Sequence, residues 1–302
     1  MREIEFMELE FIDVIQAVSD GVMKGSTYAL IALGYTMIFG VMQRLNLTYA
    51  AASVGGAYAS LVVIAYAPDI NVFVVFGASI IVSGVLGYAV YLACFRFIPL
   101  ANPLATLMAT IGCLFFVEEL IVEATDGMPQ PYPAMPYDEY FEFGMYSIRG
   151  DLILIFLFCV VATLIFLYML YRTRLGIATR AVAQQPVAAR LAGMSIEKTN
   201  AITFIITGLL GGLAAAMVGA VVSILSPLVI LPITVKGLIA TVIGGLGSLP
   251  GAIVAGLMVG GFEEFFLIAT SVTQRDLYVM LLLFIFLVFR PGGLFPTSAE
   301  RD

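Results

Sequence analysis

The feature of this sequence that most limits its fold is a series of long apolar stretches. In Leu152–Tyr171, for example, nearly every residue is apolar. A helix that crosses the hydrocarbon core of a bilayer needs about 20 such residues. Hydrophobic residues make up 61% of the chain and charged residues 12%, against about 45–50% and 25% in soluble domains. This surplus of apolar surface is too large for one water-soluble core, and it predicts an integral membrane protein.

The apolar stretches predict helices rather than the strands of a membrane barrel. Lipid offers no partners for backbone N–H and C=O groups, which a helix satisfies internally. Barrel strands alternate polar and apolar residues over about ten positions, and residues 152–171 lack this alternation. We therefore predict an all-α, polytopic membrane helix bundle with about eight or nine spans. The expected spans are 21–40, 46–66, 71–95, 104–122, 152–171, 200–225, 234–247, 250–269 and 277–289.

The span at 234–247 is short and ends in a glycine-rich motif. At 1.5 Å per residue it covers about 20 Å of a hydrocarbon core about 30 Å thick. Glycine and proline in the motif cannot continue a regular helix. Broken helices occur where the backbone is buried in protein or lines a cavity, so the motif is a candidate for a transport pathway. The residues of this predicted broken helix pair are Gly244, Gly245, Gly247, Ser248, Pro250 and Gly251.

The basic residues of the short loops predict the orientation of the chain. Cytoplasmic loops carry an excess of Lys and Arg, which here places the N-terminus outside and the C-terminus in the cytoplasm. The main cytoplasmic loop is 172–198, and the longest outer loop, 123–151, is rich in proline and acidic residues. The inner side then holds Arg44, Arg96, Arg172, Arg174, Arg180, Arg190, Lys198, Arg290 and Arg301, and the outer side Arg2, Lys24, Arg149, Lys236 and Arg275.

Residues 1–20 are predicted to form an acidic element ahead of the transmembrane domain, 21–302. Acidic residues outnumber the single Arg2 there, so the segment lacks the positive region of a signal peptide. Its apolar positions, from Ile4 to Val18, recur at helical spacing, which favours an amphipathic helix near a membrane surface. A solvated leader is an equal alternative for the first ten residues.

Small residues recur four positions apart in several spans, a spacing that lets helix backbones approach closely. Glycine is frequent in any membrane bundle, which is the alternative explanation for each single pair. Together the pairs indicate a tightly packed bundle. They are Gly21/Gly25, Gly208/Gly212, Gly247/Gly251 and Gly256/Gly260.

Several kinds of chemistry are missing from the sequence. Without histidine, neither a Ser-His-Asp nor a Cys-His arrangement can be built. Cys94, Cys113 and Cys159 form no CxxC pair, so we expect no metal site. The glycine cluster 244–251 lacks the Lys-Ser/Thr of a P-loop, and a net charge of −7 argues against nucleic acid as a partner. We therefore expect no catalytic residues and no cofactor, and ATP hydrolysis, if any, in another subunit.

The cytoplasmic loop contains a short helix signal. Proline favours the first position of a helix and glycine its end, which predicts a helix from about Pro186 to Gly193. Val187, Leu191 and Met194 would share one stripe, and this stripe could dock into a groove on a partner. An ordinary connecting loop with a surface helix is the alternative.

Four blocks of the sequence resemble the branched-chain amino-acid ABC transporter permeases of the LivH type. The blocks follow the order of that family over nearly the whole chain, and the first and third are long and specific. They are residues 25–37 (GSTYALIALGYTM), residues 176–193, including GIATRA and ARLAG, residues 241–252 (TVIGGLGSLPGA), and residues 290–295 (RPGGLF).

The resemblance implies a complex in the cell inner membrane. It implies a second related permease subunit, two cytoplasmic ATPase subunits and a periplasmic solute-binding protein, with a branched-chain amino acid or a related small polar solute moved by alternating access. The coupling helix would pass ATP-driven motion to the lipid-embedded bundle. Its candidate contact residues are Gln184, Val187, Ala188, Ala189, Arg190, Leu191 and Gly193.

One block departs from the family pattern at the start of the second span. The family usually reads Asn-Phe-Ala-His-Gly, and this chain reads Asn46-Leu47-Thr48-Tyr49-Ala50. The solute could therefore be urea, an amide or an aromatic acid instead of leucine, isoleucine or valine. The candidate pathway residues are Thr27, Tyr28, Asn46, Thr48, Tyr49, Ser53 and Lys236.

Most pathway candidates have a structural alternative, which for Thr27 and Tyr28 is packing between helices. Asn46 could cap a helix, Thr48 and Ser53 could bond to backbone, and Lys236 could be an interfacial anchor. Pairs of glutamates, Glu118/Glu119 and Glu263/Glu264, are expected at the outer ends of two spans, where they could contact the binding protein. A stand-alone secondary transporter or channel is the rival function; it would need ionisable residues in mid-membrane.

Overall fold

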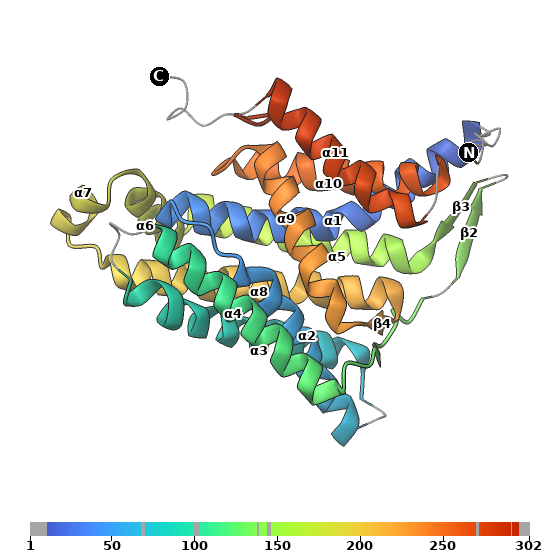
Figure 1. Cartoon of the computed structure of the whole chain (residues 1–302), viewed down its shortest axis with the longest axis horizontal. Helices are drawn as coiled ribbons and strands as arrows, with labels where there is room; N and C mark the ends of the chain where they lie inside the picture. Colours follow the sequence, from blue (N-terminus) through green and yellow to red (C-terminus); the bar gives the residue numbers. More distant parts are fainter. Residues whose placement is uncertain are drawn as a thin grey trace.

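The computed structural model describes residues 11–67, 70–98, 103–137, 139–143, 146–269, 272–290 and 292–295. The described part is an all-α bundle, as predicted (Figure 1). Within it, eight helices are long and apolar enough to cross a membrane, and a shorter apolar helix runs over Leu277–Phe286. The helices are α1 (Phe11–Met42), α2 (Thr48–Tyr66), α3 (Val72–Val90), a π-helix (Tyr91–Arg96), α4 (Pro103–Thr125), α5 (Gly150–Arg172), α6 (Arg174–Gln184), α7 (Pro186–Leu191), α8 (Ile196–Val222), a 3₁₀ turn (Pro227–Val229), α9 (Ile230–Gly244), α10 (Leu249–Ala269) and α11 (Val272–Phe289).

The predicted separate N-terminal element lies partly outside the described residues, which begin at Phe11. From there the chain forms one continuous helix to Met42, so residues 11–20 are the first turns of α1. The orientation residues Arg2 and Arg301, and Pro291 of the last block, also lie outside the described part.

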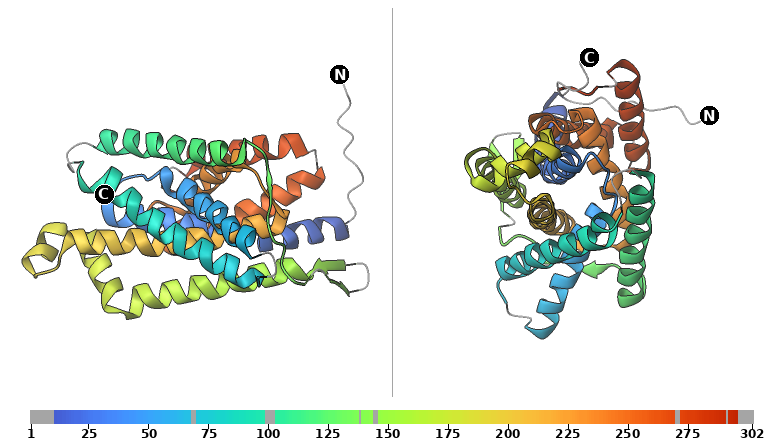
Figure 2. Two further views of the ribbon diagram at one scale, coloured as in Figure 1. Left: turned by 90° about the horizontal axis from the view of Figure 1, so that it is seen from below. Right: turned by 90° about the vertical axis from the view of Figure 1, so that its left-hand side faces the viewer.

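Helix α1 lies at the centre of the bundle, with α9 and α10 on one side and α2 and α8 on the other (Figures 1 and 2). Its close contact with α10 depends on glycine. A Cβ atom at Gly25 would lie 2.8 Å from the Gly256 carbonyl oxygen, and one at Gly21 would lie 2.6 Å from that of Gly260. The predicted small-residue pairs 21/25 and 256/260 therefore face each other.

A second glycine contact joins α8 to α3. A Cβ atom at Gly208 would lie 2.6 Å from the Ser83 carbonyl oxygen, and one at Gly212 would lie 2.7 Å from that of Ser79. Ser79 Oγ donates a hydrogen bond to the Gly212 carbonyl at 2.9 Å. These contacts fix α3 on the side of α8, because the two backbones can approach this closely only where Gly208 and Gly212 of α8 carry no side chain.

The long loop between α4 and α5, predicted to lie outside and called the outer loop, packs onto the bundle through short strands. Strand β1 (Gln130–Pro131) pairs with β4 (Ile224–Leu225), and β2 (Tyr140–Phe143) pairs with β3 (Tyr146–Arg149). Tyr132 is 3% exposed and stacks on Phe76 at 6.2 Å between ring centroids. Burial raises the pKa of the Tyr132 phenol, so the group stays neutral. Its ring packs in the apolar interior, and its hydroxyl lies 3.4 Å from Ser60 Oγ.

The glycine-rich motif forms the turn between α9 and α10. The helices end and begin at Gly244 and Leu249, and Gly245 and Gly247 have φ of 100° and 87°, values that glycine adopts without strain. Residues 292–295 pack on this turn. Leu294 N–H donates to the Ile243 carbonyl at 2.8 Å and Phe295 N–H to the Gly244 carbonyl at 3.3 Å, which satisfies carbonyls left free at a helix end.

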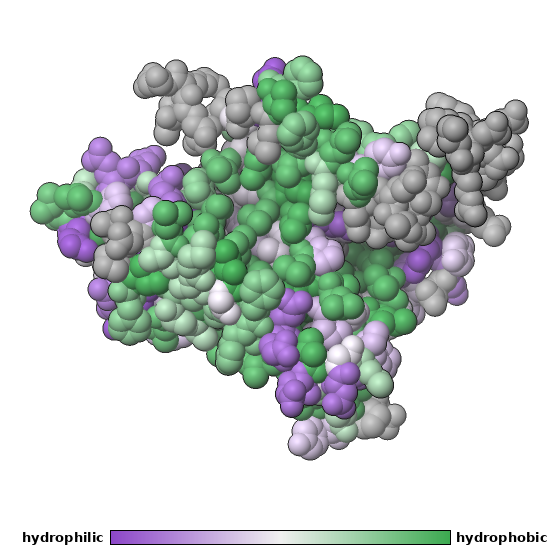
Figure 3. Space-filling view, viewed as in Figure 1, coloured by the Kyte–Doolittle hydropathy of each residue, from purple (hydrophilic) through white to green (hydrophobic). Residues whose placement is uncertain are grey.

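The surface of the molecule matches a membrane-spanning body. Apolar residues cover the middle of the face in Figure 3, and hydrophilic residues gather at the end that carries α6 and α7 and near the outer loops. Large side chains such as Phe116 on α4, Leu164 on α5 and Phe284 on α11 are more than half exposed. In water such side chains would be costly, whereas in lipid they are well solvated.

Candidate functional site

A cavity of about 290 Å³ lies between α1, α8, α9 and α10, at the end of the bundle predicted to face outside and called the outer end. Three of the predicted pathway residues, Thr27, Tyr28 and Lys236, line it. Val218, Val221, Val222, Val229, Pro232, Ile233 and Gly260 form its apolar wall, and Lys24, Glu263 and Glu264 complete it.

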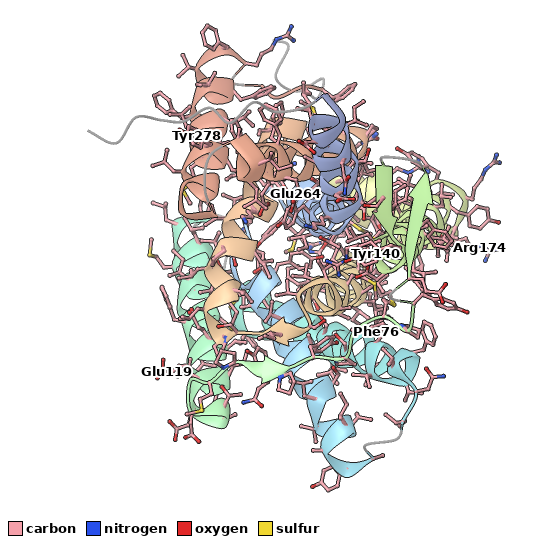
Figure 4. All side chains as sticks on the ribbon, turned by 90° about the vertical axis from the view of Figure 1, so that its right-hand side faces the viewer. Phe76, Glu119, Tyr140, Arg174, Glu264 and Tyr278 are labelled. Carbon is pink, nitrogen blue, oxygen red and sulfur yellow. The ribbon has the colours of Figure 1, made fainter. Side chains whose placement is uncertain are left out.

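Two ion pairs lie in this outer cavity. Lys24 Nζ is 2.6 Å from Glu264 Oε1, and the two side chains are 29% and 13% exposed. Lys236 Nζ is 2.8 Å from Glu263 Oε1, with side-chain exposures of 10% and 6%. The first pair is therefore near the mouth of the cavity and the second is deeper. Figure 4 shows Glu264 beside α1, the helix that carries Lys24.

Lys236 lies deeper than the sequence indicated. We expected it to begin a short helix at about residue 234, but α9 starts at Ile230, so Lys236 stands in its second turn. It is 8% exposed, pairs with Glu263, and its Nζ lies 5.7 Å from the centroid of the Tyr28 ring. Glu263 likewise is buried in α10 and does not project from the outer end of a span.

The pairing of both glutamates with lysines was missed by sequence reasoning. The signal was present, because Lys24, Lys236, Glu263 and Glu264 all stand inside otherwise apolar stretches. An ionisable residue within a span faces the bundle interior and finds a partner there. The other glutamate pair, half-buried Glu118 and exposed Glu119 on α4, does not line this cavity, and Glu119 lies at the lower left of Figure 4.

A second cavity, of about 520 Å³, opens at the opposite end of α1. It is bounded by the inner end of α1, by α6 and by the α9–α10 turn. From the predicted sets it contains Gln184 and Gly247. Its lining residues are Thr36, Met37, Phe39, Gly40, Val41, Gln43, Leu170, Thr179, Arg180, Ala183, Gln184, Leu246, Gly247 and Leu249.

The stretch of α1 between the two cavities is closed. Leu30, Ile31, Ala32 and Leu33 have no exposed surface. On one side, Thr241 Oγ1 of α9 donates to the Ala32 carbonyl at 3.3 Å. From Tyr28, which lines the outer cavity, to Thr36, which lines the inner one, α1 rises by about 12 Å. A solute in one cavity is thus separated from the other by a packed layer of this thickness.

Tyr49 belongs to this closed layer. It is 3% exposed and packs edge-on against Tyr35 with ring centroids 4.9 Å apart. Its hydroxyl fills the space beside Gly34 and Gly211, where added Cβ atoms would collide with it or stand 3.0 Å away. No hydrogen-bond partner within the described part of the chain reaches this hydroxyl.

The other predicted pathway residues of α2 are also buried and line neither cavity. Thr48 Oγ1 donates to the Thr110 carbonyl at 2.7 Å, and Ser53 Oγ donates to the Tyr49 carbonyl at 2.8 Å. Asn46 is 3% exposed and accepts the Tyr49 N–H on its own carbonyl at 3.4 Å. Ser53 therefore packs beside Tyr49 and Gly211, whereas Thr48 packs against α4.

The short cytoplasmic helix expected near Pro186 is α7, at the end of the molecule opposite the outer strands (Figure 1). Val187 and Leu191 are 74% and 86% exposed. Ala189 points the other way, is 3% exposed and packs with Val41 and Val182. Ala188, Arg190 and Gly193 are exposed, and Gly193 has φ of 83°. Helix α7 is therefore held against the inner end of α1 by one face and presents the other.

Arg44 fixes the inner loop between α1 and α2. It donates to Thr106 Oγ1 at 2.7 Å and to the Ile98 carbonyl at 3.3 Å. Burial lowers the pKa of its guanidinium, although arginine remains charged at neutral pH.

Within the described part of the chain, no group of three or more acidic, cysteine or histidine residues could hold a metal ion.

Comparison with known proteins gives a consistent result. A family described as the branched-chain amino acid transport system permease component matches residues 17–289. The chain is 30% identical to the high-affinity branched-chain amino acid transport system permease protein BraD of Pseudomonas aeruginosa, over 94% of this chain and 96% of that relative. It is 26% identical to the LivH permease protein of Escherichia coli, over 95% and 97% of the two chains. The chain also resembles PsaBC from Streptococcus pneumoniae with a TM-score of 0.44 and 12% identity, over 94% of each chain, too weakly to carry an argument.

Proposed function

The chain belongs to the family of branched-chain amino acid transport system permease components, and from this premise we propose how it works as a multi-pass permease of the inner membrane. It supplies the membrane conduit of an ABC importer and pairs with a second, related permease. Two cytoplasmic ATPases bind the inner face, and a periplasmic binding protein delivers the solute. The solute is a branched-chain amino acid, the class named for BraD and LivH.

The observation that carries this proposal is the pair of cavities at opposite ends of α1. One lies at the outer end and the other at the inner end, with closed packing between Tyr28 and Thr36. A channel would need a continuous path, whereas an alternating-access transporter needs two half-paths of which only one is open at a time. The closed layer is the part that must move during transport.

The ATPases contact the permease at α7, and the motion driven by ATP hydrolysis is passed to the bundle through this helix. Val187 and Leu191 are exposed apolar side chains on the inner side, and a short helix with such anchors fits a groove on a partner. Its buried face contacts the inner end of α1 through Ala189 and Val41. Movement of α7 by the ATPases would therefore be transmitted to the wall of the inner cavity, which includes Val41.

ATP hydrolysis is assigned to the partner subunits. The sequence contains no P-loop motif and no histidine, and the glycine-rich motif 244–251 serves as the turn between α9 and α10. ATP hydrolysis and solute transport therefore take place in different subunits.

The test is ATP-driven uptake of radiolabelled leucine by the complete complex reconstituted in proteoliposomes. Val187→Asp with Leu191→Asp should leave folding nearly unchanged, because both side chains are exposed and surface changes stay within about 0.5 kcal/mol. Removing one anchor of an interface costs about 2 kcal/mol or more, which is about thirtyfold in ATPase affinity for each of the two residues. Uptake and co-purification of the ATPases should both be lost.

The matched control is Phe97→Ser, which removes an apolar side chain, 75% exposed, that also lies on the inner side but outside α6 and α7. It should retain uptake. Ala189→Asp is unsuitable, because Ala189 is buried and the carboxylate would disturb packing. Unchanged uptake and ATPase retention in the double variant, or leucine uptake by the wild-type complex without ATP, would show that the proposal is wrong.

A further inference from the structure

The outer cavity combines two ion pairs, one partly exposed and one buried, with an aliphatic wall. Lys24 pairs with Glu264 near the mouth, and Lys236 pairs with Glu263 deeper inside. Opposite them stand valine and isoleucine side chains of α8 and α9, namely Val218, Val221, Val222, Val229 and Ile233. Its volume of about 290 Å³ is just below the usual lower limit for ligand sites, about 300 Å³, which suits a small solute.

Charged side chains inside a membrane bundle lower its stability, so their presence indicates a role in function. Each buried ion loses hydration worth several kcal/mol, and a pair of apolar side chains often holds helices together equally well. Ionisable residues within spans accordingly mark substrate paths. Here two pairs line one cavity, while the glycine contacts already join α1 to α10 without them.

We propose that this cavity is a subsite for an aliphatic α-amino acid in its zwitterionic form. The solute carboxylate binds one of the lysines, the solute ammonium binds one of the glutamates, and the aliphatic side chain lies on the valine and isoleucine wall. The inference deepens the proposed function, since it names the chemical form in which the solute enters the conduit.

Selectivity follows from charge balance. In the empty cavity each lysine already has a glutamate at 2.6–2.8 Å. A zwitterion that enters between the pairs separates one lysine from its glutamate. Its carboxylate then replaces the glutamate at the lysine, and its ammonium replaces the lysine at the glutamate. An anionic or cationic solute leaves one of the separated protein charges without a new partner. A neutral amide or urea leaves both without one. Leaving a buried charge uncompensated is strongly unfavourable, so the site discriminates against these solutes.

The arrangement also orders the binding event. The outer pair is more exposed than the inner one, so an arriving solute meets Lys24 and Glu264 first. Tyr28 lies one turn below Lys24 on α1 and faces Lys236 at 5.7 Å. The solute can therefore pass from the mouth pair to the deep pair along a single helix face.

The test uses the purified wild-type complex in nanodiscs without the binding protein, so that only the membrane subunits contribute. We expect millimolar L-leucine to raise the melting temperature, because a ligand stabilises the state that it binds. Leucinamide, 4-methylpentanoate and urea, which lack one or both charges, should not raise it. The three probes separate the carboxylate, the ammonium and the shape of the ligand.

Two variants locate the effect. Lys236→Met with Glu263→Leu removes the deep pair without leaving a lone charge, and Lys24→Gln with Glu264→Gln replaces the mouth pair by neutral groups of similar size. Each should weaken leucine binding about tenfold to a hundredfold, the range for a charge-assisted contact. The control Arg149→Gln with Asp151→Asn neutralises an ion pair outside the cavity without leaving a lone charge, and it should leave the leucine shift unchanged.

Absence of a leucine shift in the wild type, an equal shift with leucinamide or urea, or a full shift in both pair variants would overturn the subsite. If the first pair variant fails to fold, the second decides the question alone, because its side chains are partly exposed. ATP-driven uptake by the wild-type complex is measured separately. Intact uptake with a failed melting test would refute the subsite while leaving the proposed function in place.

Discussion

The contact between α3 and α8 gives a prediction whose size can be worked out from the structure. At Gly208, an added Cβ atom would lie 2.6 Å from the Ser83 carbonyl oxygen and 3.0 Å from Gly84 Cα. At Gly112 on α4, nothing stands within 4 Å. Alanine is therefore tolerated at Gly112, whereas at Gly208 the backbones of two helices must separate.

The expected free energies follow from two effects. Replacing glycine by alanine inside a helix stabilises by about 0.5–1 kcal/mol, and this gain is common to both positions. Overpacking costs about 1–3 kcal/mol, and only Gly208→Ala incurs it. The difference in free energy of unfolding between the two variants is then about 1–3 kcal/mol, with Gly112→Ala more stable than the wild type.

The buried thiols offer a direct assay. Cys94 and Cys159 are 2% and 1% exposed, so a thiol-reactive fluorophore reports on unfolding during a temperature ramp. Gly208→Ala should melt below the wild type and Gly112→Ala at or above it. If Gly208→Ala melts as high as Gly112→Ala, glycine is not required for the α3–α8 contact, and the reasoning about close backbone approach fails.

Two further predictions concern the closed layer. Tyr49→His should change the preference among solutes in uptake assays, because Tyr49 fills the layer beside Gly34, while Tyr49→Phe should not, since the hydroxyl has no partner within the described part of the chain; identical uptake profiles for Tyr49→His and the wild type would contradict this. In a background without the native cysteines, Tyr28→Cys should react with a membrane-impermeant maleimide only from outside and Phe39→Cys only from inside, since these half-buried residues line opposite cavities. Labelling of both positions from the same side, without ATP, would mean that the layer is not a barrier.

Most of the fold could be predicted from the sequence, because lipid leaves few choices. Long apolar runs such as 152–171 must be helical, and α5 covers Gly150–Arg172. The glycine pairs 21/25 and 256/260 also lie where their spacing indicated, in close contact. The start of α9 was harder to predict, because Pro227 begins a 3₁₀ turn that leads directly into the helix and shifts Lys236 one turn inward.

The site could be predicted only in part, because partners across helices leave no trace in one sequence. Nothing local links Lys236 to Glu263, or Lys24 to Glu264, although each pair lies within 3 Å in the fold. Helical spacing predicted one stripe of Val187, Leu191 and Met194, but only the first two are exposed. Met194 is partly buried and packs on the cluster that includes Ala189 and Val41, and Val41 is distant in sequence. The roles of Tyr49 and of the other pathway candidates in transport stay predictions.

The hydrogen bonds from Leu294 and Phe295 to the end of α9 have a consequence for biosynthesis. A ribosome makes α9 and α10 before it makes α11 and the segment that follows. Until then the carbonyls of Ile243 and Gly244 lack these donors. The hairpin of α9 and α10 can therefore insert early, but its turn gains these hydrogen bonds only after Phe295 has been synthesised. Translation arrested before that point should yield a permease in which the wall of the inner cavity formed by this turn is less stable.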